Sequence, residues 1–337
     1  MKKGRKSITM SEKLNMAIAG IGRIGVTHLA VLNQTANMCL KAIVEPREEV
    51  GRKYAEMCHC DYYKNISELA AREDIQAVDI CVPEEYHVDA AVAAAKAGKH
   101  ILLEKPLAKT YEECQQIIAA AKEYNVRLMV AHTCHFMPQY QRVRNECQDG
   151  RIGELNEVAI RRYGPRVTNE YVKGRVTIGF YMAIHDLDAS MWMTGHKIVE
   201  VFAEKIDKLG LYGEDGLDMA FKYENGACGT MNVSWTLPAA YPGSVAELDL
   251  IGDKGIIRME PYNSGVMAYT DRVSPVSLVQ TKIDGQMWGA YSNELYHFAD
   301  AILNNKEFNV DNEESAYAVK VIEAALRSVE SHRAEPV

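Results

Sequence analysis

Gly20-Ile21-Gly22-Arg23-Ile24-Gly25 follows directly on the apolar residues Met16-Ala17-Ile18-Ala19. The glycines of this GxGxxG run permit a tight turn from a strand into a helix and let the backbone approach a pyrophosphate closely. The amides that open the following helix, expected from Val26 to Leu32, would then hold that anion. The stretch therefore predicts a dinucleotide-binding turn, with Arg23 and Ile24 among the residues that contact the cofactor.

Glu45 ends the next apolar segment, 39–44, twenty residues after the last glycine. A carboxylate at this place can accept hydrogen bonds from an adenosine ribose and would repel a 2′-phosphate, so it favours NAD over NADP. Arg47 could still meet a phosphate, which leaves NADP open. The alternative interpretation is a glycine-rich turn beside an ordinary surface acid.

The bulk properties limit the classes of function. A chain of 337 residues suggests two domains, and a net charge of −8 offers no basic surface for nucleic acid or an anionic membrane. No apolar run reaches the roughly 20 residues of a transmembrane helix. We expect a cytoplasmic protein with a flexible extension over residues 1–12. The Cys/His groups at 58–60 and 132–135 lack the paired spacing of a structural zinc site, so no metal is expected.

Residues 13–133 are predicted to form a Rossmann-type domain, because short β-rich segments alternate with helical ones in the rhythm of a parallel, doubly wound sheet. The strands are almost continuously apolar, as suits strands covered on both faces: 16–19, 40–44, 77–82, 101–103 and 128–131. A helix over 88–97 is stopped by Gly98. Thr110 and Glu113 form a capping box that opens a helix to about residue 124.

Residues 134–337 are predicted to form an α+β domain that binds substrate and supports a homo-oligomer. Strands follow one another with short turns, which favours an open, mainly antiparallel sheet: 158–163, 198–206, 218–223, 228–235, 246–251 and 255–259. Helices are expected at 185–194, 293–303 and 313–331, on one face of the sheet. The other face is a candidate oligomer surface.

Ligands of parallel sheets bind outside the carboxyl ends of the strands, so the residues that follow each strand are the functional candidates. Pro83 and His87 follow the third strand, Glu104-Lys105-Pro106 follows the fourth, and His132 to His135 follow the last. A Lys105-Pro106 bond could be cis, since only a bond to proline reaches that isomer at low cost.

These motifs together resemble the Gfo/Idh/MocA family of oxidoreductases, which includes inositol dehydrogenases and glucose-fructose oxidoreductase. The resemblance runs in order from about residue 14 to 331, and the Glu-Lys-Pro triplet after a GxGxxG domain is its most specific element. It also rests on Pro83 with His87, Ala97-Gly98-Lys99-His100, Pro138 with Tyr140, Gly150-Arg151-Ile152-Gly153 and His185-Asp186-Leu187-Asp188. It implies a Rossmann domain followed by an α/β substrate domain, NAD(P) as cofactor, and polyol or sugar hydroxyls as substrate.

The resemblance implies that Lys105 and His185 are catalytic. A cation at Lys105 would stabilise the alkoxide that develops as hydride leaves carbon. The alternative is that Lys105 is a surface lysine paired with Glu104. An imidazole at His185 can accept the hydroxyl proton, although a single histidine beside an apolar helix is more often structural. Pro83, His87, Glu104 and Lys105 are expected to contact the cofactor, with Lys105 reaching its nicotinamide side.

Tyr181 stands where dehydrogenases of the family usually have an aspartate, four residues before the histidine. It could donate a hydrogen bond to His185 or contact substrate, but it supplies no fixed negative charge. Asp186 or Asp188 could take that role, although Asp188 more simply holds the start of its helix.

Further substrate contacts are assigned to His132, His135 and Trp235, which has an aromatic face for a sugar; Tyr163 is a weaker candidate. For all of them core or wall packing is the alternative. The hypothesis is an NAD-dependent dehydrogenase of a cyclic polyol, sugar or glycoside. Its rivals are a non-catalytic regulator that binds NAD(P) and a sugar, and an enzyme that reduces its substrate or oxidises it transiently with tightly held NAD.

Overall fold

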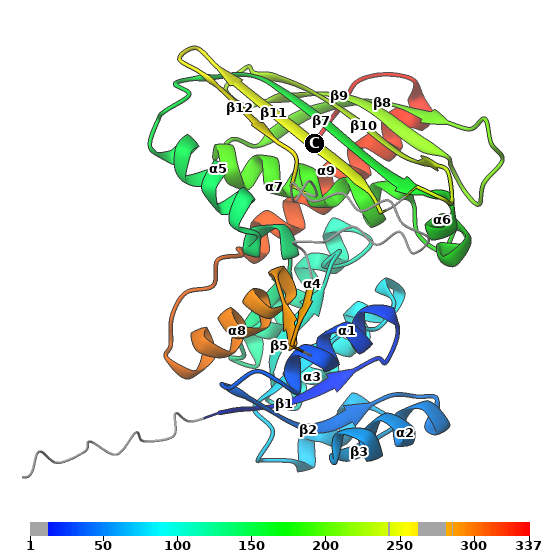
Figure 1. The fold of residues 1–337 in the computed structure, drawn as a ribbon, viewed down its shortest axis with the longest axis vertical. Helices are drawn as coiled ribbons and strands as arrows, with labels where there is room; N and C mark the ends of the chain where they lie inside the picture. The colour runs from blue at the N-terminus through cyan, green and yellow to red at the C-terminus, as the bar shows by residue number, and fades with distance from the viewer. Residues whose placement is uncertain (1–12, 242, 262–280, 285) are drawn as a thin grey trace, which may run out of the picture.

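The structure is a computed structural model, and it describes residues 13–241, 243–261, 281–284 and 286–337. The extension expected over residues 1–12 lies outside this range. Figure 1 shows two layered units along the long axis, one built from the N-terminal half and one from most of the C-terminal half. None of the helices in the described parts of the chain is long and apolar enough to cross a bilayer.

The first unit contains a parallel sheet in the order β3-β2-β1-β4-β5-β6, as a Rossmann domain requires. Its strands are β1 Leu14–Ala19, β2 Met38–Val44, β3 Asp61–Tyr63, β4 Ala77–Ile80, β5 His100–Glu104 and β6 Leu128–Ala131. Its helices are α1 Arg23–Leu32, α2 Glu48–Cys58, α3 His87–Lys96 and α4 Tyr111–Glu123, with 3₁₀ turns η1 Ile66–Ala71, η2 Glu84–Tyr86 and η3 Thr133–Phe136. The predicted rhythm is confirmed, except that the sequence did not indicate β3, which has three residues and no apolar run.

Local signals fixed two of these helices as expected. The Thr110 hydroxyl accepts a hydrogen bond from the amide of Glu113 at 3.1 Å and caps α4. Helix α3 ends just before Gly98, which has a φ of 70°. Helix α1 begins at Arg23, three residues before the predicted start, because Gly25, the last glycine of the turn, already lies within the helix.

The second unit contains a sheet in the order β12-β11-β7-β10-β9-β8-β15. Its strands are β7 Leu155–Pro165, β8 Ile198–Ile206, β9 Gly216–Tyr223, β10 Cys228–Leu237, β11 Val245–Gly252, β12 Ile256–Met259 and β15 Glu335–Pro336. The pairing is antiparallel except between the central strands β7 and β10, which run parallel. The sheet is therefore mixed at its centre, which the succession of strands in the sequence did not indicate.

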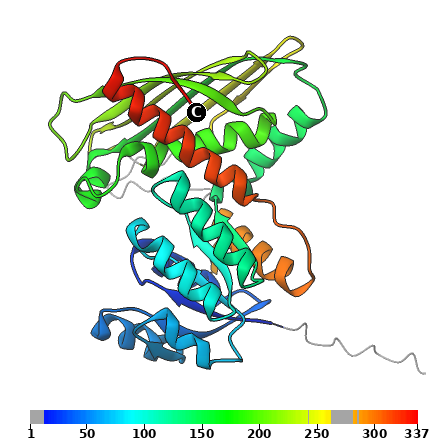
Figure 2. The same ribbon diagram turned by 180° about the vertical axis from the view of Figure 1, so that it is seen from behind.

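Helices cover one face of this sheet, as Figures 1 and 2 show. They are α5 Pro138–Gln148, α7 Ile184–Thr194 and α9 Asn312–Ser331, with the short α6 Arg166–Val172 at one end. Helix α9 packs against β8 and α7 and also reaches α4 of the first unit. The layering is confirmed, and assembly through the other face of the sheet stays a prediction.

Helix α8 Ala290–Leu303 does not belong with the second sheet, although the boundary predicted at residue 134 placed it there. It packs against α1, β1 and η3 of the first unit, and Figure 1 shows it beside that unit. The small β13–β14 hairpin, Thr281–Ile283 and Gln286–Trp288, precedes it. The chain thus returns to the Rossmann sheet, because the apolar face of α8 finds its buried partners there.

Candidate active site

The glycine turn has the space and the free amides that a pyrophosphate needs. Gly20 has a φ of 89°, and a Cβ there would lie 2.8 Å from the carbonyl oxygen of Cys81. A Cβ on Gly25 would lie 2.0 Å from the oxygen of Gly20, whereas one on Gly22 would face open space. No side chain caps the N-terminus of α1, so its first amides face that space without a side-chain acceptor. These residues, with Arg23 and Ile24 in the first turn, fit a dinucleotide.

Glu45 holds this turn through a hydrogen bond to its backbone. Its carboxylate accepts hydrogen bonds from the amide of Ile21 at 2.9 Å and from the Nε of Arg47 at 2.7 Å, and the residue is only 2 % exposed. Burial opposes ionisation, but the hydrogen bonds from Arg47 and Ile21 outweigh it and lower the pKa of Glu45. A ribose contact would therefore have to replace or share the Arg47 hydrogen bonds.

His87 connects two backbone segments rather than presenting a free nitrogen. Its Nδ1 lies 2.8 Å from the oxygen of Pro106 and its Nε2 lies 3.1 Å from the oxygen of Val82, and the ring is buried. Burial lowers the pKa of His87, so the ring is neutral and donates to one of these two oxygens at a time. His87 thus holds the Glu-Lys-Pro turn to the loop that begins with Pro83, and its contact with the cofactor stays a prediction.

Lys105 extends from the end of β5 to the second unit. Its Nζ donates a hydrogen bond to the backbone oxygen of Tyr181 at 2.7 Å and lies 4.8 Å from the centre of the Tyr181 ring. The Lys105-Pro106 bond is cis, the isomer that the sequence left open. Burial lowers the pKa of Lys105 to about 8, although the charges of Glu104 and Glu84 oppose that change.

His185 is the second residue of α7 and follows a π-helical turn, Gly179–Ala183, where the sequence indicated only an α-helix beginning near His185. Among the described residues it has no hydrogen-bond partner. Burial, and then the charges of Lys105 and Arg162, hold its pKa well below the usual value. The imidazole is therefore neutral and able to accept a proton.

Tyr181 and Trp235 form an aromatic pair in which only the tyrosine is accessible. Their ring centres are 5.2 Å apart, and Trp235 is 1 % exposed. No hydrogen bond joins Tyr181 to the His185 ring among the described contacts. The prediction that Trp235 offers a face to a sugar is wrong for this arrangement, because the ring is packed in the core behind Tyr181.

The two acids of α7 are both engaged elsewhere. Asp186 forms a buried ion pair with Arg162, whose Nη2 lies 2.7 Å from its Oδ1. Asp188 lies within the helix, 2.7 Å from Nε2 of His135 and 3.2 Å from Nδ1 of His132. Asp188 thus lies beside two histidines, with a hydrogen bond to His135 only, rather than holding the helix start, and neither acid takes the place of the aspartate that the family usually has before His185.

His132 and His135 are buried beside this carboxylate. His135 stacks on Trp192 with 4.0 Å between ring centres, and its Nδ1 faces the oxygen of Asn309 at 3.3 Å. Both of its nitrogens have partners, which supports the packing interpretation over substrate contact. The nitrogens of His132 have no hydrogen bond within the described structure, and burial lowers its pKa to about 4.

The sequence did not point to Arg162, nor to a buried group of His28, Asp79 and Cys81, the one set in the described residues with metal-like donor spacing. The available signal was Asp79, a charged residue inside the otherwise apolar strand β4. Neither of the Cys/His segments considered from sequence forms such a set in the parts of the chain that are described.

Comparison with known proteins decides the family. Residues 14–132 match the model of an oxidoreductase family with an NAD-binding Rossmann fold, and residues 144–337 match the C-terminal alpha/beta domain of the same family. The chain belongs to the Gfo/Idh/MocA family of oxidoreductases. It is thus an oxidoreductase, and its first domain binds NAD.

Members of the Gfo/Idh/MocA family resemble this chain over nearly its whole length. Inositol 2-dehydrogenase of Rhizobium meliloti is 27% identical, over 95% of this chain and 98% of its own. A putative myo-inositol dehydrogenase from Sinorhizobium meliloti has the same fold, with a TM-score of 0.82 and 25% identity, over 96% of this chain and 100% of its own. Scyllo-inositol dehydrogenase from Lactobacillus casei, solved with NAD(H) and scyllo-inositol, shares the fold at a TM-score of 0.80 and 20% identity, over 96% of this chain and 99% of its own.

Proposed function

We propose that the chain is an NAD-dependent dehydrogenase that oxidises one secondary hydroxyl of a cyclic polyol, a sugar or a glycoside. The hydrogen bond from Lys105 to the oxygen of Tyr181 carries the proposal. It joins the end of a Rossmann strand to the turn that precedes His185, and so brings a cation and a neutral base to the junction of the two units. The similarity to an inositol 2-dehydrogenase supports the substrate class.

Lys105 would stabilise the oxygen of the reacting carbon. Its ammonium has three donors, and the Tyr181 oxygen uses one of them, so the others remain for a substrate hydroxyl. Because the side chain is largely buried, its interaction with a developing alkoxide is stronger than it would be in water. The aromatic ring of Tyr181 lies beside the ammonium and limits its movement.

His185 would accept the hydroxyl proton. Its lowered pKa keeps the ring neutral, as a base requires, but no carboxylate of the described residues bonds to the ring to stabilise the imidazolium that forms. The cationic form is therefore short-lived and must lose its proton before the next turnover. The amides of Gly22 to Gly25 would hold NAD, and the cofactor would supply the acceptor for the hydride of the same carbon.

Glu45 and Arg47 support NAD as the preferred cofactor over NADP. The Arg47 guanidinium is 62 % exposed, but its charge is already paired with the buried Glu45 carboxylate. A 2′-phosphate would have to break that pair and would lie beside the remaining carboxylate. Dissociation constants for the two cofactors, measured by calorimetry, test this preference, and tighter binding of NADP would contradict it.

The test of the function is an assay of NADH formation across inositols, aldoses and glycosides. Lys105→Ala and His185→Ala should each lower kcat by at least about 100-fold and leave NAD affinity nearly unchanged. Lys109→Ala, at an exposed residue of the same loop, is the matched control and should retain activity. Binding of NAD without turnover of any substrate would favour the regulator instead, and full activity of both variants would remove the assignment.

A further inference from the structure

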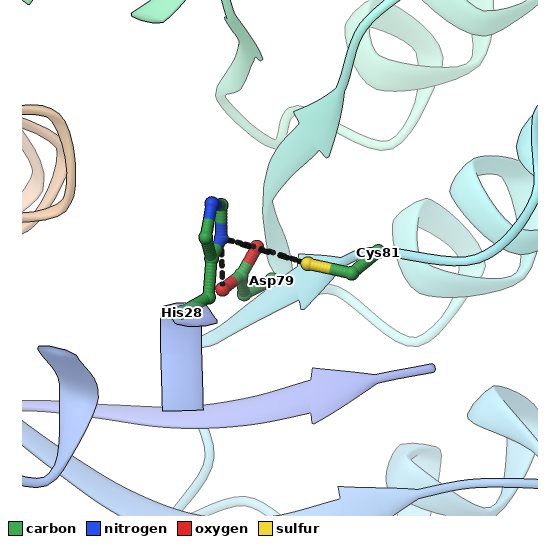
Figure 3. A group of neighbouring side chains, drawn as sticks. All are labelled: His28, Asp79 and Cys81. Carbon is green, nitrogen blue, oxygen red and sulfur yellow. Dashed lines mark hydrogen bonds and ion pairs between the residues drawn. The ribbon is translucent and has the colours of Figure 1, made fainter. Parts of the chain in front are cut away.

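A buried charged pair lies in the core of the first unit, where the dinucleotide turn does not require it. His28 of α1 and Asp79 of β4 have no exposed surface, and Nδ1 of the histidine lies 3.0 Å from one Asp79 oxygen and 3.2 Å from the other. Figure 3 shows both side chains facing each other, with Cys81 beside them. Charges are rarely buried in this way unless they are paired, and apolar residues would pack the same space at lower cost.

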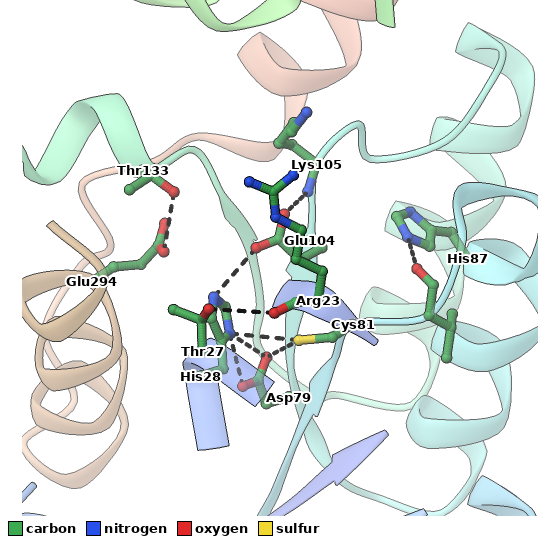
Figure 4. A network of polar contacts seen from close by, with 11 residues as sticks. Arg23, Thr27, His28, Asp79, Cys81, His87, Glu104, Lys105, Thr133 and Glu294 are labelled. Carbon is green, nitrogen blue, oxygen red and sulfur yellow. Dashed lines mark hydrogen bonds and ion pairs between the residues drawn. The ribbon is translucent and has the colours of Figure 1, made fainter. Parts of the chain in front are cut away.

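The second nitrogen of His28 leads to the Glu-Lys-Pro motif. Nε2 lies 3.3 Å from Oε1 of Glu104, and Oε2 of the same carboxylate accepts a hydrogen bond from the amide of Lys105 at 3.1 Å. Figure 4 shows Asp79, His28, Glu104 and Lys105 following one another from the sheet toward the second unit. A carboxylate faces each ring nitrogen, so the arrangement suits an imidazolium, which bonds to Asp79 on one side and lies in ion-pair contact with Glu104 on the other, without hydrogen-bond geometry there.

The electrostatics agree with this geometry. Burial alone would lower the pKa of His28, but Asp79 and Cys81 raise it well above the usual value. Burial would raise the pKa of Glu104, but its contacts with His28 and Lys105 lower it. The charges of the four side chains therefore alternate in sign, from Asp79 through His28 and Glu104 to Lys105, and they sum to zero.

We propose that His28 and Asp79 are positioning residues that keep Glu104 ionised, and that Glu104 in turn holds the Lys105 backbone amide and keeps the Lys105 side chain charged. This inference rests on the function proposed for Lys105. It gives the buried His28–Asp79 pair a role in the site, whereas the stability of the fold does not require a charged pair there. Without the His28 cation, Glu104 would be a buried carboxylate beside Asp79 and would take up a proton.

The other charged groups near Lys105 are paired with an opposite charge or are uncharged, and Glu104 is the carboxylate that raises the Lys105 pKa most. Glu84 is paired with Arg175, and Arg162 is paired with Asp186. Burial keeps the Cys134 thiol protonated and His132 and His185 neutral. On the Glu104 side, burial and the Glu104 charge hold the pKa of Glu294 on α8 well above the usual value, so that acid is neutral too.

His28, Asp79 and Cys81 have donor atoms within 4.8 Å of one another, a spacing that would also admit a metal ion. Their mutual hydrogen bonds account for the geometry without one, since the Cys81 thiol donates to Asp79 at 3.4 Å. The row of charged side chains continues from His28 Nε2 to Glu104. A metal bound by His28 Nδ1, Asp79 and Cys81 would not require that contact. We therefore assign the group to the positioning of Lys105.

The experiment measures the protonation of Lys105 directly. The rate of Lys105 acylation in the NAD-free protein is followed against pH by peptide mass spectrometry, for the wild type, His28→Gln, Glu104→Gln and the double variant. Loss of the neighbouring carboxylate charge should lower the Lys105 pKa by about one unit or more, which makes acylation about tenfold faster at slightly acidic pH. His28→Gln and Glu104→Gln should give this shift alike, and the double variant should give no more, because His28 acts through Glu104.

Cys81→Ala is the matched control, since it changes the same cluster without removing a charge, and its Lys105 titration should not move. Asp79→Asn keeps the shape of the side chain and should act in the same direction if His28→Gln fails to fold. An unchanged or raised Lys105 pKa in these variants, additive effects in the double variant, or a stoichiometric bound metal would overturn the proposal. Acylation needs no turnover, so it separates this outcome from failure of the proposed function, which only the NADH assay detects.

Discussion

The lowered pKa of Lys105 predicts that the dehydrogenase loses activity in mildly alkaline solution. The perturbation is the pH itself, together with Lys105→Arg, which keeps a cation at that position at every accessible pH. Lys105 has a pKa of about 8 because burial outweighs the charges of Glu104 and Glu84. The protonated amine is the form that stabilises an alkoxide, so activity must fall as pH rises through this value.

The magnitude follows from that value. About nine-tenths of the amine is protonated one unit below its pKa and about one-tenth one unit above it, so kcat/KM should fall about tenfold between pH 7 and pH 9. The His185 pKa is held well below its usual value, so this base stays neutral over the whole interval and contributes no opposing limb. The profile should therefore be flat near neutrality and fall with unit slope above about pH 8.

The assay is the initial rate of NADH formation at low substrate concentration, because kcat/KM reports the free enzyme. The activity that Lys105→Arg retains should show no fall between pH 7 and pH 9. Lys109→Ala should keep the wild-type profile, since that side chain is exposed and outside the site. A wild-type profile that rises or stays flat to pH 9, or the same alkaline fall in Lys105→Arg, would refute the reasoning.

Three further predictions concern the framework of the site. Glu45→Ala leaves the Ile21 amide without its buried acceptor and should cost about 1–3 kcal/mol of stability and weaken NAD binding, as measured by urea unfolding and calorimetry; unchanged NAD affinity would contradict the role of Glu45. Arg162→Met leaves Asp186 as an uncompensated buried charge and should cost about 3–5 kcal/mol in urea unfolding, with part of the loss recovered when Asp186→Leu is added. Gly25→Ala puts a Cβ 2.0 Å from a backbone oxygen of the turn, so it should abolish NAD binding, and normal affinity would show that the turn can shift.

The features predicted correctly from the sequence depend on short stretches of chain. The GxGxxG turn needs glycines at fixed spacing, because Gly20 has a positive φ and Gly25 has no room for a Cβ. The apolar strands, the Thr110 cap and the stop at Gly98 are likewise set by residues within a few positions of one another. The Glu-Lys-Pro triplet could be placed at a strand end for the same reason, since it follows an apolar run directly.

The partners of the polar side chains were decided by the tertiary structure. Glu45 meets Ile21 and Arg47, while Asp188 meets His132 and His135, and no local pattern distinguishes these outcomes from the surface or helix-start roles that the sequence suggested. Trp235 was assigned to the substrate side for a similar reason: an aromatic residue at a strand end has the same sequence pattern whether it faces a ligand or the core.

The sequence by itself determined the dinucleotide turn, the Rossmann rhythm and the identity of the two groups proposed for catalysis, Lys105 and His185. Only the tertiary structure brought Lys105 to Tyr181 and showed that His28 contacts both Asp79 and Glu104. The physical reason is that backbone conformation follows from steric rules between near neighbours, whereas the charge state of a buried side chain depends on groups that the fold brings within a few ångströms from distant parts of the chain.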